Sequence, residues 1–401
     1  MQLSAQPWLQ AASTQALLAA FARAGYPLRF VGGCVRDAIM GRAVGDVDCA
    51  TPATPDQVMA LLAAAQIKCV PTGLAHGTVT AIIAHQPFEI TTLRRDTACD
   101  GRHAEVAFTT DWAEDAQRRD FTMNALYCDA EGHIHDYTQG IADAQSRRVV
   151  FIGDAQHRIR EDGLRILRFF RFLATHGAPP ADDSAIIACT QLRDRLHDLS
   201  GERIQQEMRK LLAAPSPLAS LQAMFDAGVL GELITLDHLP VAALQRYDAL
   251  CDALHISPHP WLRLALIAHR AQPSALPIAQ RWKLSNADAA LLDSLRRHDV
   301  LGLPDDSHSL TMQLRRYGRE LRQALLLRDA AEQDYPLDAV VVLYNACATQ
   351  AIPQFPISGA DLLALGYAQG AAIGTALKAL EDYWEAQHYQ PDKAALLARL
   401  K

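Results

Sequence analysis

The chain has 401 residues, of which 50% are hydrophobic and 21% are charged, and its formal net charge is −7. This balance excludes a largely disordered chain, and the length predicts roughly two to three domains. The sequence contains no apolar run of about 18 residues, so we expect no transmembrane helix and predict a cytoplasmic protein. Because the net charge is negative, a nucleic-acid partner would need a local basic surface.

Short β-type runs alternate with helix-like segments up to about residue 150. The predicted helices in this part include residues 9–24, 34–40 and 56–65. The predicted strands are residues 28–31, 77–84, 88–93, 106–108, 125–128 and 133–136. No CxxC pair occurs among the eight cysteines, which predicts free thiols and excludes a zinc ribbon.

Helical spacing dominates after about residue 155, where strand patterns almost vanish. In residues 200–212, for example, apolar side chains recur on one helical face at Ile204, Met208, Leu211 and Leu212. We therefore predict an α+β protein in which a head with a small mixed β-sheet and helices precedes an all-α remainder. The predicted divisions are residues 1–150, 151–215 and 216–401.

Two aspartates separated by one residue, Asp46 and Asp48, follow the first predicted strand. In a strand, this spacing places both carboxylates on one face, where they repel each other unless a cation lies between them. Hard oxygen ligands suit Mg²⁺. The same spacing also occurs in solvated turns and helix caps, and that alternative stays open at this point.

A glycine pair, Gly32-Gly33, lies between the first predicted strand and a short predicted helix. Glycine there allows a phosphate to approach the backbone at a helix N-terminus, and Arg36 follows in the first turns of that helix. A tight turn is the alternative use of the pair. Glu89, in a β-type run, is a third acidic candidate, and three convergent carboxylates would suit two-metal phosphoryl transfer.

Acidic and basic side chains share one predicted helical face at Asp162, Arg165 and Arg168. A solvated amphipathic helix with an internal salt bridge explains this pattern. It also suits base recognition: a carboxylate accepts a hydrogen bond from the exocyclic amine of cytosine or adenine, and a guanidinium donates to the ring acceptors beside it. Arg119 is a candidate for a further nucleotide contact.

Several segments together resemble the class II CCA-adding tRNA nucleotidyltransferases, which belong to the polymerase β-type nucleotidyltransferase superfamily. The resemblance is strong over residues 28–173 and weaker over the helical remainder. The matching segments, in order, are VGGCVRD with GDVDCAT, GLAHGTV with FEITTLR, RRDFTMNA, DYTQG and REDGLRILRFFRF. The resemblance implies that residues 1–150 are the nucleotidyltransferase head, 151–215 a neck with the nucleotide-selecting helix, and 216–401 a body and tail that bind tRNA.

The resemblance also implies roles for individual residues. Asp46 and Asp48 would bind Mg²⁺ as catalytic residues, with Glu89 assisting them. Gly33 and Arg36 would hold the triphosphate of the incoming nucleotide.

Four further residues would act on the nucleotide. Arg119 and Arg168 would help to hold it, and Asp162 with Arg165 would select CTP and then ATP as a protein template. Residues 95–104 correspond to the flexible loop that such enzymes use to change from C to A, which favours complete CCA addition.

Two positions depart from the family pattern. The motif that commonly reads D-P-x-x-G has Tyr137 in place of proline, and Gly163 follows Asp162 where proline or alanine is common. We expect little effect from Tyr137, because that motif looks structural. Glycine within a helix costs roughly 0.5–1 kcal/mol relative to alanine, and less near a helix N-terminus.

The implied function is template-independent addition of CCA to the 3′ end of tRNA, from CTP and ATP, with release of pyrophosphate. The implied partners are the tRNA acceptor arm and 3′ end, and no membrane or protein partner is indicated. A poly(A) polymerase and a split-activity enzyme that adds only CC or only A are the alternatives. A tRNA-binding protein without catalysis is disfavoured by the intact pair of Asp46 and Asp48.

Overall fold

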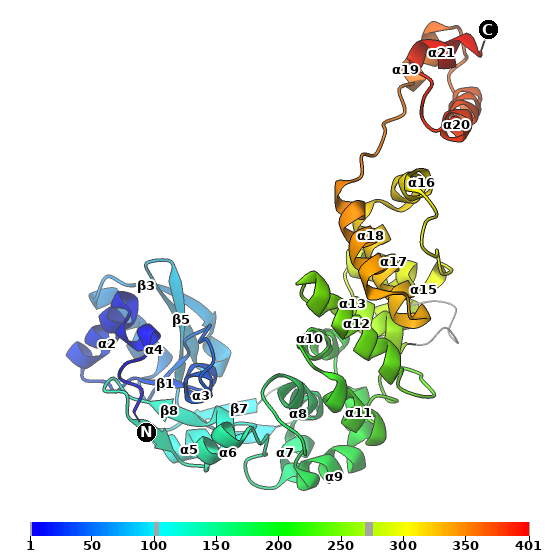
Figure 1. Cartoon of the computed structure of the whole chain (residues 1–401). Coiled ribbons are helices and arrows are strands. Elements are labelled where there is room, and N and C mark those ends of the chain that lie inside the picture. The colour runs from blue at the N-terminus through cyan, green and yellow to red at the C-terminus, as the bar shows by residue number, and fades with distance from the viewer. Residues whose placement is uncertain (1, 100–103, 269–275, 401) are drawn as a thin grey trace. The chain divides into compact units, whose positions relative to one another are not determined.

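The computed structural model describes residues 2–99, 104–268 and 276–400 (Figure 1). The chain divides into two compact units. The first extends to Leu239 and includes residues 258–260 and 277–285, and the second contains the rest. Among the residues described, none of the helices combines the length and apolar character needed to cross a membrane. The division at residues 150 and 215 stays a prediction.

A seven-stranded mixed sheet forms the centre of the first unit, in the order β3-β4-β5-β2-β1-β8-β9. Its strands are β1 (Arg29–Val31), β2 (Cys49–Thr51), β3 (Lys68–Gly73), β4 (Thr78–Ile83), β5 (Gln86–Thr92), β8 (Leu126–Cys128) and β9 (Ile134–Asp136). β2 and β5 are parallel, and the other neighbours are antiparallel. β6 (Arg94–Cys99) and β7 (Ala104–Phe108) pair separately.

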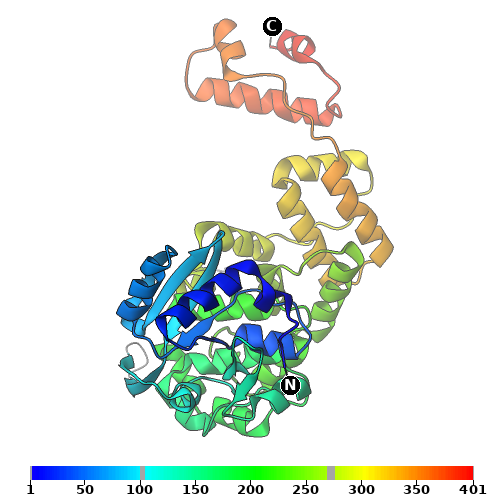
Figure 2. The same ribbon diagram turned by 90° about the vertical axis from the view of Figure 1, so that its left-hand side faces the viewer.

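The described residues of this part form six α-helices: α1 (Pro7–Gln10), α2 (Ala12–Ala24), α3 (Gly33–Ile39), α4 (Pro55–Ala64), α5 (Trp112–Gln117) and α6 (Gly140–Ser146). Helices α2 and α4 contact each other and β4, and α3 contacts β1 and β8. Figure 2 shows α2, in dark blue, lying over the lighter blue strands. The α+β prediction is therefore confirmed.

The predicted elements differ from the structure at several places. The predicted helix 9–24 is interrupted at Ala11, whose ψ of 138° is extended. Strands β2, β3 and β6 were not predicted, because none of them has the alternating apolar pattern of a half-buried strand. Residues 95–104, the predicted flexible loop, form parts of β6 and β7 at either end, and its centre, residues 100–103, lies outside the described residues.

A helical layer follows the sheet within the first unit: α7 (Ala155–Glu161), α8 (Leu164–Thr175), α9 (Asp183–Gln191), α10 (Gly201–Leu212) and α11 (Leu218–Asp226). Helix α8 contacts α7, α10 and α11. Aromatic rings join α8 to the strand region, since Phe121 packs against Phe151, Phe169 and Phe172 with centroids 4.9–6.4 Å apart. This packing fixes α8 next to the RRDFTMNA segment.

Asp136 organises the DYTQG segment. Its carboxylate accepts hydrogen bonds from the backbone N–H groups of Thr138, Gly140 and Ile141, at 2.9–3.0 Å, and so binds the start of α6. A carboxylate there satisfies N–H groups that have no partner within the helix. Tyr137 takes no part in these three bonds, so the segment does not depend on proline at that position.

Gly140 packs so closely that no side chain fits. A Cβ atom there would lie 2.1 Å from the carbonyl oxygen of Thr122, which belongs to the backbone and cannot move alone. We expect Gly140→Ala to lower the free energy of unfolding by about 1–3 kcal/mol, as overpacking does. Urea denaturation measures this, with Gly374→Ala as the control, because a Cβ at Gly374 meets no atom within 4 Å. An unchanged unfolding midpoint for Gly140→Ala would contradict the prediction.

The described part of the second unit is helical. Its helices are α12 (Val241–Leu254), most of α13 (Pro260–Ile267), α15 (Asn286–Arg297), α16 (Ser307–Tyr317), α17 (Arg319–Gln333), α18 (Leu337–Thr349), α19 (Gly359–Ala364), α20 (Ala371–Ala386) and α21 (Lys393–Ala398), while α14 (Leu276–Arg281) lies mainly in the first unit. Buried Leu362, Leu380, Trp384 and Leu396 give the last three helices a core of their own.

Candidate functional site

A cavity of about 570 Å³ in the first unit brings together every predicted site residue except Asp46. They line it with side chains from segments that are far apart in the sequence. The predicted residues on its wall are Gly33, Arg36, Asp48, Glu89, Arg119, Asp162, Arg165 and Arg168.

Strand pairing places Asp48 beside Glu89. In the parallel pair of β2 and β5, Cys49 lies opposite Ile90, so the residues just before them are neighbours. Cys49 and Ile90 are buried, which turns Asp48 and Glu89 away from the core. Asp46 and Asp48 lie just before β2 rather than within it, yet the Asp48 carbonyl accepts the Val31 N–H at 2.9 Å and continues the pairing with β1.

The charge on Asp48 is unfavourable without a cation. Burial raises the pKa of its carboxyl to about 6, and the charges of Glu89 and Asp46 act in the same direction. Crowded carboxylates whose ionised forms are destabilised suit a divalent cation, because the cation removes the repulsion. The donor set therefore fits a divalent metal ion.

The described residues contain one group of three side chains whose ligand atoms all lie within 4.8 Å of one another, and it is Asp129, Glu131 and His133. That group is not on the cavity wall. The Asp129 carboxylate already accepts hydrogen bonds from the backbone N–H groups of Glu131 and His133, at 3.1 and 2.8 Å, as in an ordinary polar turn. Asp46, Asp48 and Glu89 do not come that close as a trio, so their joint role in metal binding stays a prediction.

Gly32 and Gly33 begin α3 at the cavity wall. Gly32 has a φ of +74°, which favours glycine, and a Cβ there would lie 3.6 Å from the Asn124 carbonyl oxygen. Arg36 is buried and oriented by two partners. Its guanidinium donates to Asn124 Oδ1 at 2.7 Å and to both carboxylate oxygens of Asp37, at 2.9 and 3.1 Å. A fixed cation thus stands beside the N-terminus of a helix, an arrangement that suits an anion.

Asp115, which the sequence analysis missed, holds Arg119 in place. Arg119 donates to Asp115 Oδ2 at 3.0 Å and to the Tyr127 hydroxyl at 3.2 Å, and Tyr127 donates to Asp115 at 2.6 Å. Arg118 pairs with the other oxygen of Asp115 at 2.7 Å. Burial acts to raise the pKa of the Asp115 carboxyl, but the charges of Arg119 and Arg118 outweigh it and hold that pKa at about 2.

Asp115→Asn is therefore expected to destabilise the protein. The folded-state pKa lies below the ordinary value of 3.8, so the stabilisation is complete above about pH 4 and is lost as the pH falls towards 2. The free energy of unfolding that Asp115→Asn loses at pH 7 is about 2 kcal/mol, which lowers Tm by about 5 °C. Thermal melts from pH 7 to pH 3 test this, with Glu114→Gln on the same helix as the control. A difference in Tm that grows on acidification would contradict it.

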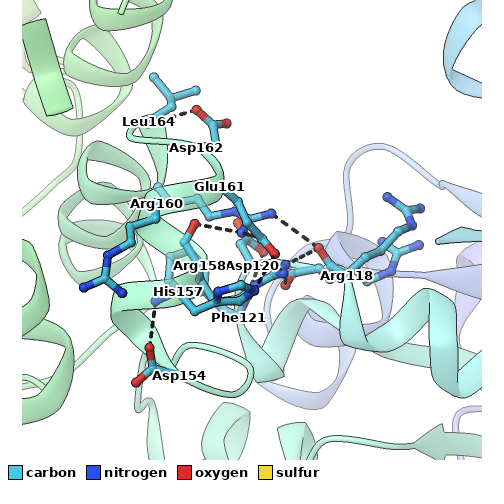
Figure 3. Close-up of polar contacts among 12 residues, drawn as sticks. Arg118, Asp120, Phe121, Asp154, His157, Arg158, Arg160, Glu161, Asp162 and Leu164 are labelled. Carbon is cyan, nitrogen blue, oxygen red and sulfur yellow. Dashed lines mark hydrogen bonds and ion pairs between the residues drawn. The ribbon is translucent and has the colours of Figure 1, made fainter. Parts of the chain in front are cut away.

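Asp162 does not lie within a helix, contrary to the prediction. It ends α7 with an extended backbone (φ −154°, ψ 109°), and α8 begins at Leu164. Figure 3 shows its carboxylate turned to the Leu164 backbone, whose N–H donates to Asp162 Oδ1 at 3.1 Å. The intervening Gly163 is closely packed, since a Cβ there would lie 3.0 Å from the Arg195 carbonyl oxygen. The extended backbone of Asp162 ends α7 while its side chain bonds the first N–H of α8, and the charge spacing alone did not reveal this.

Arg165 and Arg168 are on α8 as predicted, each with an acidic partner. Arg165 contacts Glu161 and donates to the Arg158 carbonyl oxygen at 2.9 Å. Arg168 donates through Nε to Asp120 at 2.8 Å, and this charge, with the Asn124 hydrogen bond, outweighs burial and lowers the pKa of the Asp120 carboxyl. Both guanidiniums line the cavity.

Arg158 links α7 to the RRDFTMNA segment and was also missed. It is buried and donates to the Arg119 carbonyl oxygen at 2.6 Å and to Glu161 at 2.5 Å, and it contacts the Arg118 carbonyl oxygen (Figure 3). Arg158 belongs to none of the motifs, but its i, i+3 spacing to Glu161 indicates an ion pair on one helical face. These bonds fix Arg119 and Arg165 on the same wall of the cavity.

The chain is similar to known proteins over most of its length. Residues 28–150 match the family model described as the poly A polymerase head domain, and residues 182–235 match that of the probable RNA and SrmB-binding site of polymerase A. The chain is 35% identical to the zebrafish (Danio rerio) mitochondrial CCA tRNA nucleotidyltransferase 1, over 95% of this chain and 88% of that protein.

Two bacterial proteins extend the comparison. The CCA-adding enzyme of Geobacillus thermodenitrificans is 37% identical over 66% of this chain and 64% of its own length. The crystal structure of the Bacillus stearothermophilus CCA-adding enzyme in complex with CTP superposes with a TM-score of 0.80 and 28% identity, covering 98% of both chains. The chain belongs to the family of CCA-adding tRNA nucleotidyltransferases.

Proposed function

We propose that this protein adds the 3′-terminal CCA to tRNA without a nucleic-acid template, from CTP and ATP and with release of pyrophosphate. One observation carries the proposal: a single cavity is lined by Asp48 and Glu89, by the cation of Arg36 at the start of α3, and by the acceptor–donor pair of Asp162 and Arg165. Transfer of a nucleotide needs groups for a metal, a triphosphate and a base, and these residues supply all three.

The residues have distinct chemical tasks. Asp46 and Asp48 would hold Mg²⁺, with Glu89 assisting. The metal, when bound, lowers the pKa of the attacking 3′-hydroxyl and neutralises charge on the phosphates. Gly33 and Arg36 receive the triphosphate, and Arg119 and Arg168 hold the nucleotide. The hydroxyl oxygen attacks the α-phosphorus, the bond to the β-phosphate oxygen breaks, and pyrophosphate leaves.

Base choice follows from hydrogen-bond polarity. The Asp162 carboxylate accepts from the exocyclic amine of cytosine or adenine, and Arg165 donates to the ring acceptors beside that amine. Uracil and guanine present a carbonyl oxygen where the amine would be, and that oxygen would face the carboxylate without a proton between them. The pair thus selects CTP and ATP over UTP and GTP.

Three tRNA transcripts test the proposal, ending at the discriminator base, after one C and after CC. With CTP, ATP and Mg²⁺, all three are expected to end in CCA, and replacing Mg²⁺ with Mn²⁺ tests the choice of metal. Long A tails would indicate a poly(A) polymerase, the enzyme after which the family model of the head is named. Extension of only the CC transcript, or arrest after CC, would indicate a split-activity enzyme.

We also propose that the protein acts in the cytoplasm. The zebrafish relative is named as a mitochondrial enzyme. Fractionation of the source cells, with tRNA nucleotidyltransferase activity as the readout, distinguishes the two compartments.

A further inference from the structure

Helix α10 lies directly behind the nucleotide-selecting residues. Its buried face, formed by Ile204, Met208 and Leu211, anchors it in the first unit, and it contacts α8. Glu207, also buried, accepts from Arg171 Nε of α8 at 2.5 Å and lies 3.9 Å from Arg168 Nη1. One turn earlier on the same helix is Arg203.

Arg203 reaches the carboxylate that is proposed to read the base. Its Nη2 atom lies 2.7 Å from Asp162 Oδ2, while the other oxygen of Asp162 accepts the Leu164 N–H at 3.1 Å. Both side chains are partly exposed, at 34% for Arg203 and 26% for Asp162. The carboxylate is therefore held at both oxygens, one by the chain turn and one by a side chain 41 residues away.

We infer that Arg203 is a positioning residue that determines base specificity by fixing the Asp162 carboxylate. This inference rests on the proposed function, because it assigns the selection of CTP and ATP to Asp162. A carboxylate has about four acceptor positions, so two bonds to the protein leave positions for an exocyclic amine. Fixing the carboxylate before the nucleotide arrives removes the cost of orienting it at that moment.

Arg203 also holds the acceptor oxygens of Asp162 in one orientation. A charge-assisted pair with a guanidinium restricts the rotation of a carboxylate. A carboxylate that is free to rotate can turn away from the O4 oxygen of uracil, which relieves the repulsion between the two oxygens. Loss of Arg203 therefore weakens discrimination against UTP as well as binding of CTP.

The test is competition between CTP and UTP for the first addition to a tRNA transcript that ends at the discriminator base. For Arg203→Met, we expect the ratio of kcat/KM for CTP over UTP to fall about tenfold, the value of one charge-assisted hydrogen bond. The KM for tRNA is expected to stay unchanged. Arg209→Met, which removes an exposed arginine from the same helix, is the matched control and is expected to leave the ratio unchanged.

A different result overturns the inference. If Arg203 binds a tRNA phosphate instead, Arg203→Met raises the KM for tRNA and leaves the CTP over UTP ratio as in the wild type. Arg203→Lys keeps a cation but not the guanidinium geometry, so its ratio is expected between those of the wild type and Arg203→Met. If Arg203→Met does not fold, the CTP over UTP ratio of Arg203→Lys is the deciding measurement. A ratio about threefold below that of the wild type supports the inference. An unchanged ratio overturns it. Failure of the wild type to add C would instead contradict the proposed function.

Discussion

Asp48→Asn is expected to lower the rate of CMP addition to tRNA by at least about a thousandfold, because a metal contributes several kcal/mol of stabilisation in the transition state. Asparagine has nearly the same shape as aspartate but carries no charge, so the variant loses a negative charge that attracts the cation. The measurement is the single-turnover rate on a tRNA transcript that ends at the discriminator base, with saturating CTP.

The fold is expected to survive this change. Burial and the neighbouring charges of Glu89 and Asp46 destabilise the ionised form of Asp48. A neutral side chain removes that repulsion, so the metal-free variant is expected to melt no lower than the wild type at pH 8. Asp237→Asn is the control, as an exposed aspartate outside the cavity. A loss of activity below about tenfold would place the metal-binding residues elsewhere.

Asp162→Ala is expected to have the second large effect, on the choice of nucleotide. The rates with CTP and ATP should fall by about 10- to 100-fold, since a good bidentate base contact contributes about 1–3 kcal/mol of discrimination. UTP and GTP gain nothing from Asp162, so their slow incorporation should change little. The discrimination ratio is therefore expected to collapse, rather than all four rates falling together.

Extension assays with each of the four nucleotides measure this ratio directly. Asp183→Ala, which removes an exposed aspartate from the first turn of α9, provides the control. A uniform loss for all four nucleotides would contradict base reading by Asp162. It would indicate that Asp162 serves the structure alone, as the cap of α8.

The residues proposed to carry the chemistry could be named from the sequence because several short patterns, each with other uses of its own, occur together in the order of one family. The Gly32-Gly33 turn lies between the first strand and its helix, the pair of Asp46 and Asp48 follows that helix, and Glu89 lies further along on a strand of β-type residues. The sequence did not indicate the register that pairs Cys49 with Ile90 and so brings Asp48 beside Glu89. Strand register is set by packing over the whole sheet.

The supporting residues were not predictable for a different reason. Arg203 and Asp162 are 41 residues apart, and Arg158 holds a backbone carbonyl 39 residues earlier in the chain. Nothing in a sequence identifies which surface-type arginine will be buried against a distant carbonyl oxygen. The prediction for Asp162 was wrong because its spacing to Arg165 fits one continuous helix. In the structure α7 ends at Asp162, whose side chain accepts the first N–H of α8.

We propose that protein side chains in one cavity hold the metal, the triphosphate and the base. The measurement that tests it most directly is a crystal structure of this protein with CTP and Mg²⁺. We expect the triphosphate beside Gly33 and Arg36 and metal density against Asp46 and Asp48. We expect the cytosine amine within hydrogen-bonding distance of the Asp162 carboxylate, with Arg165 at the ring acceptors. A cytosine ring bound away from Asp162 and Arg165, with CTP ordered in the cavity, would contradict it.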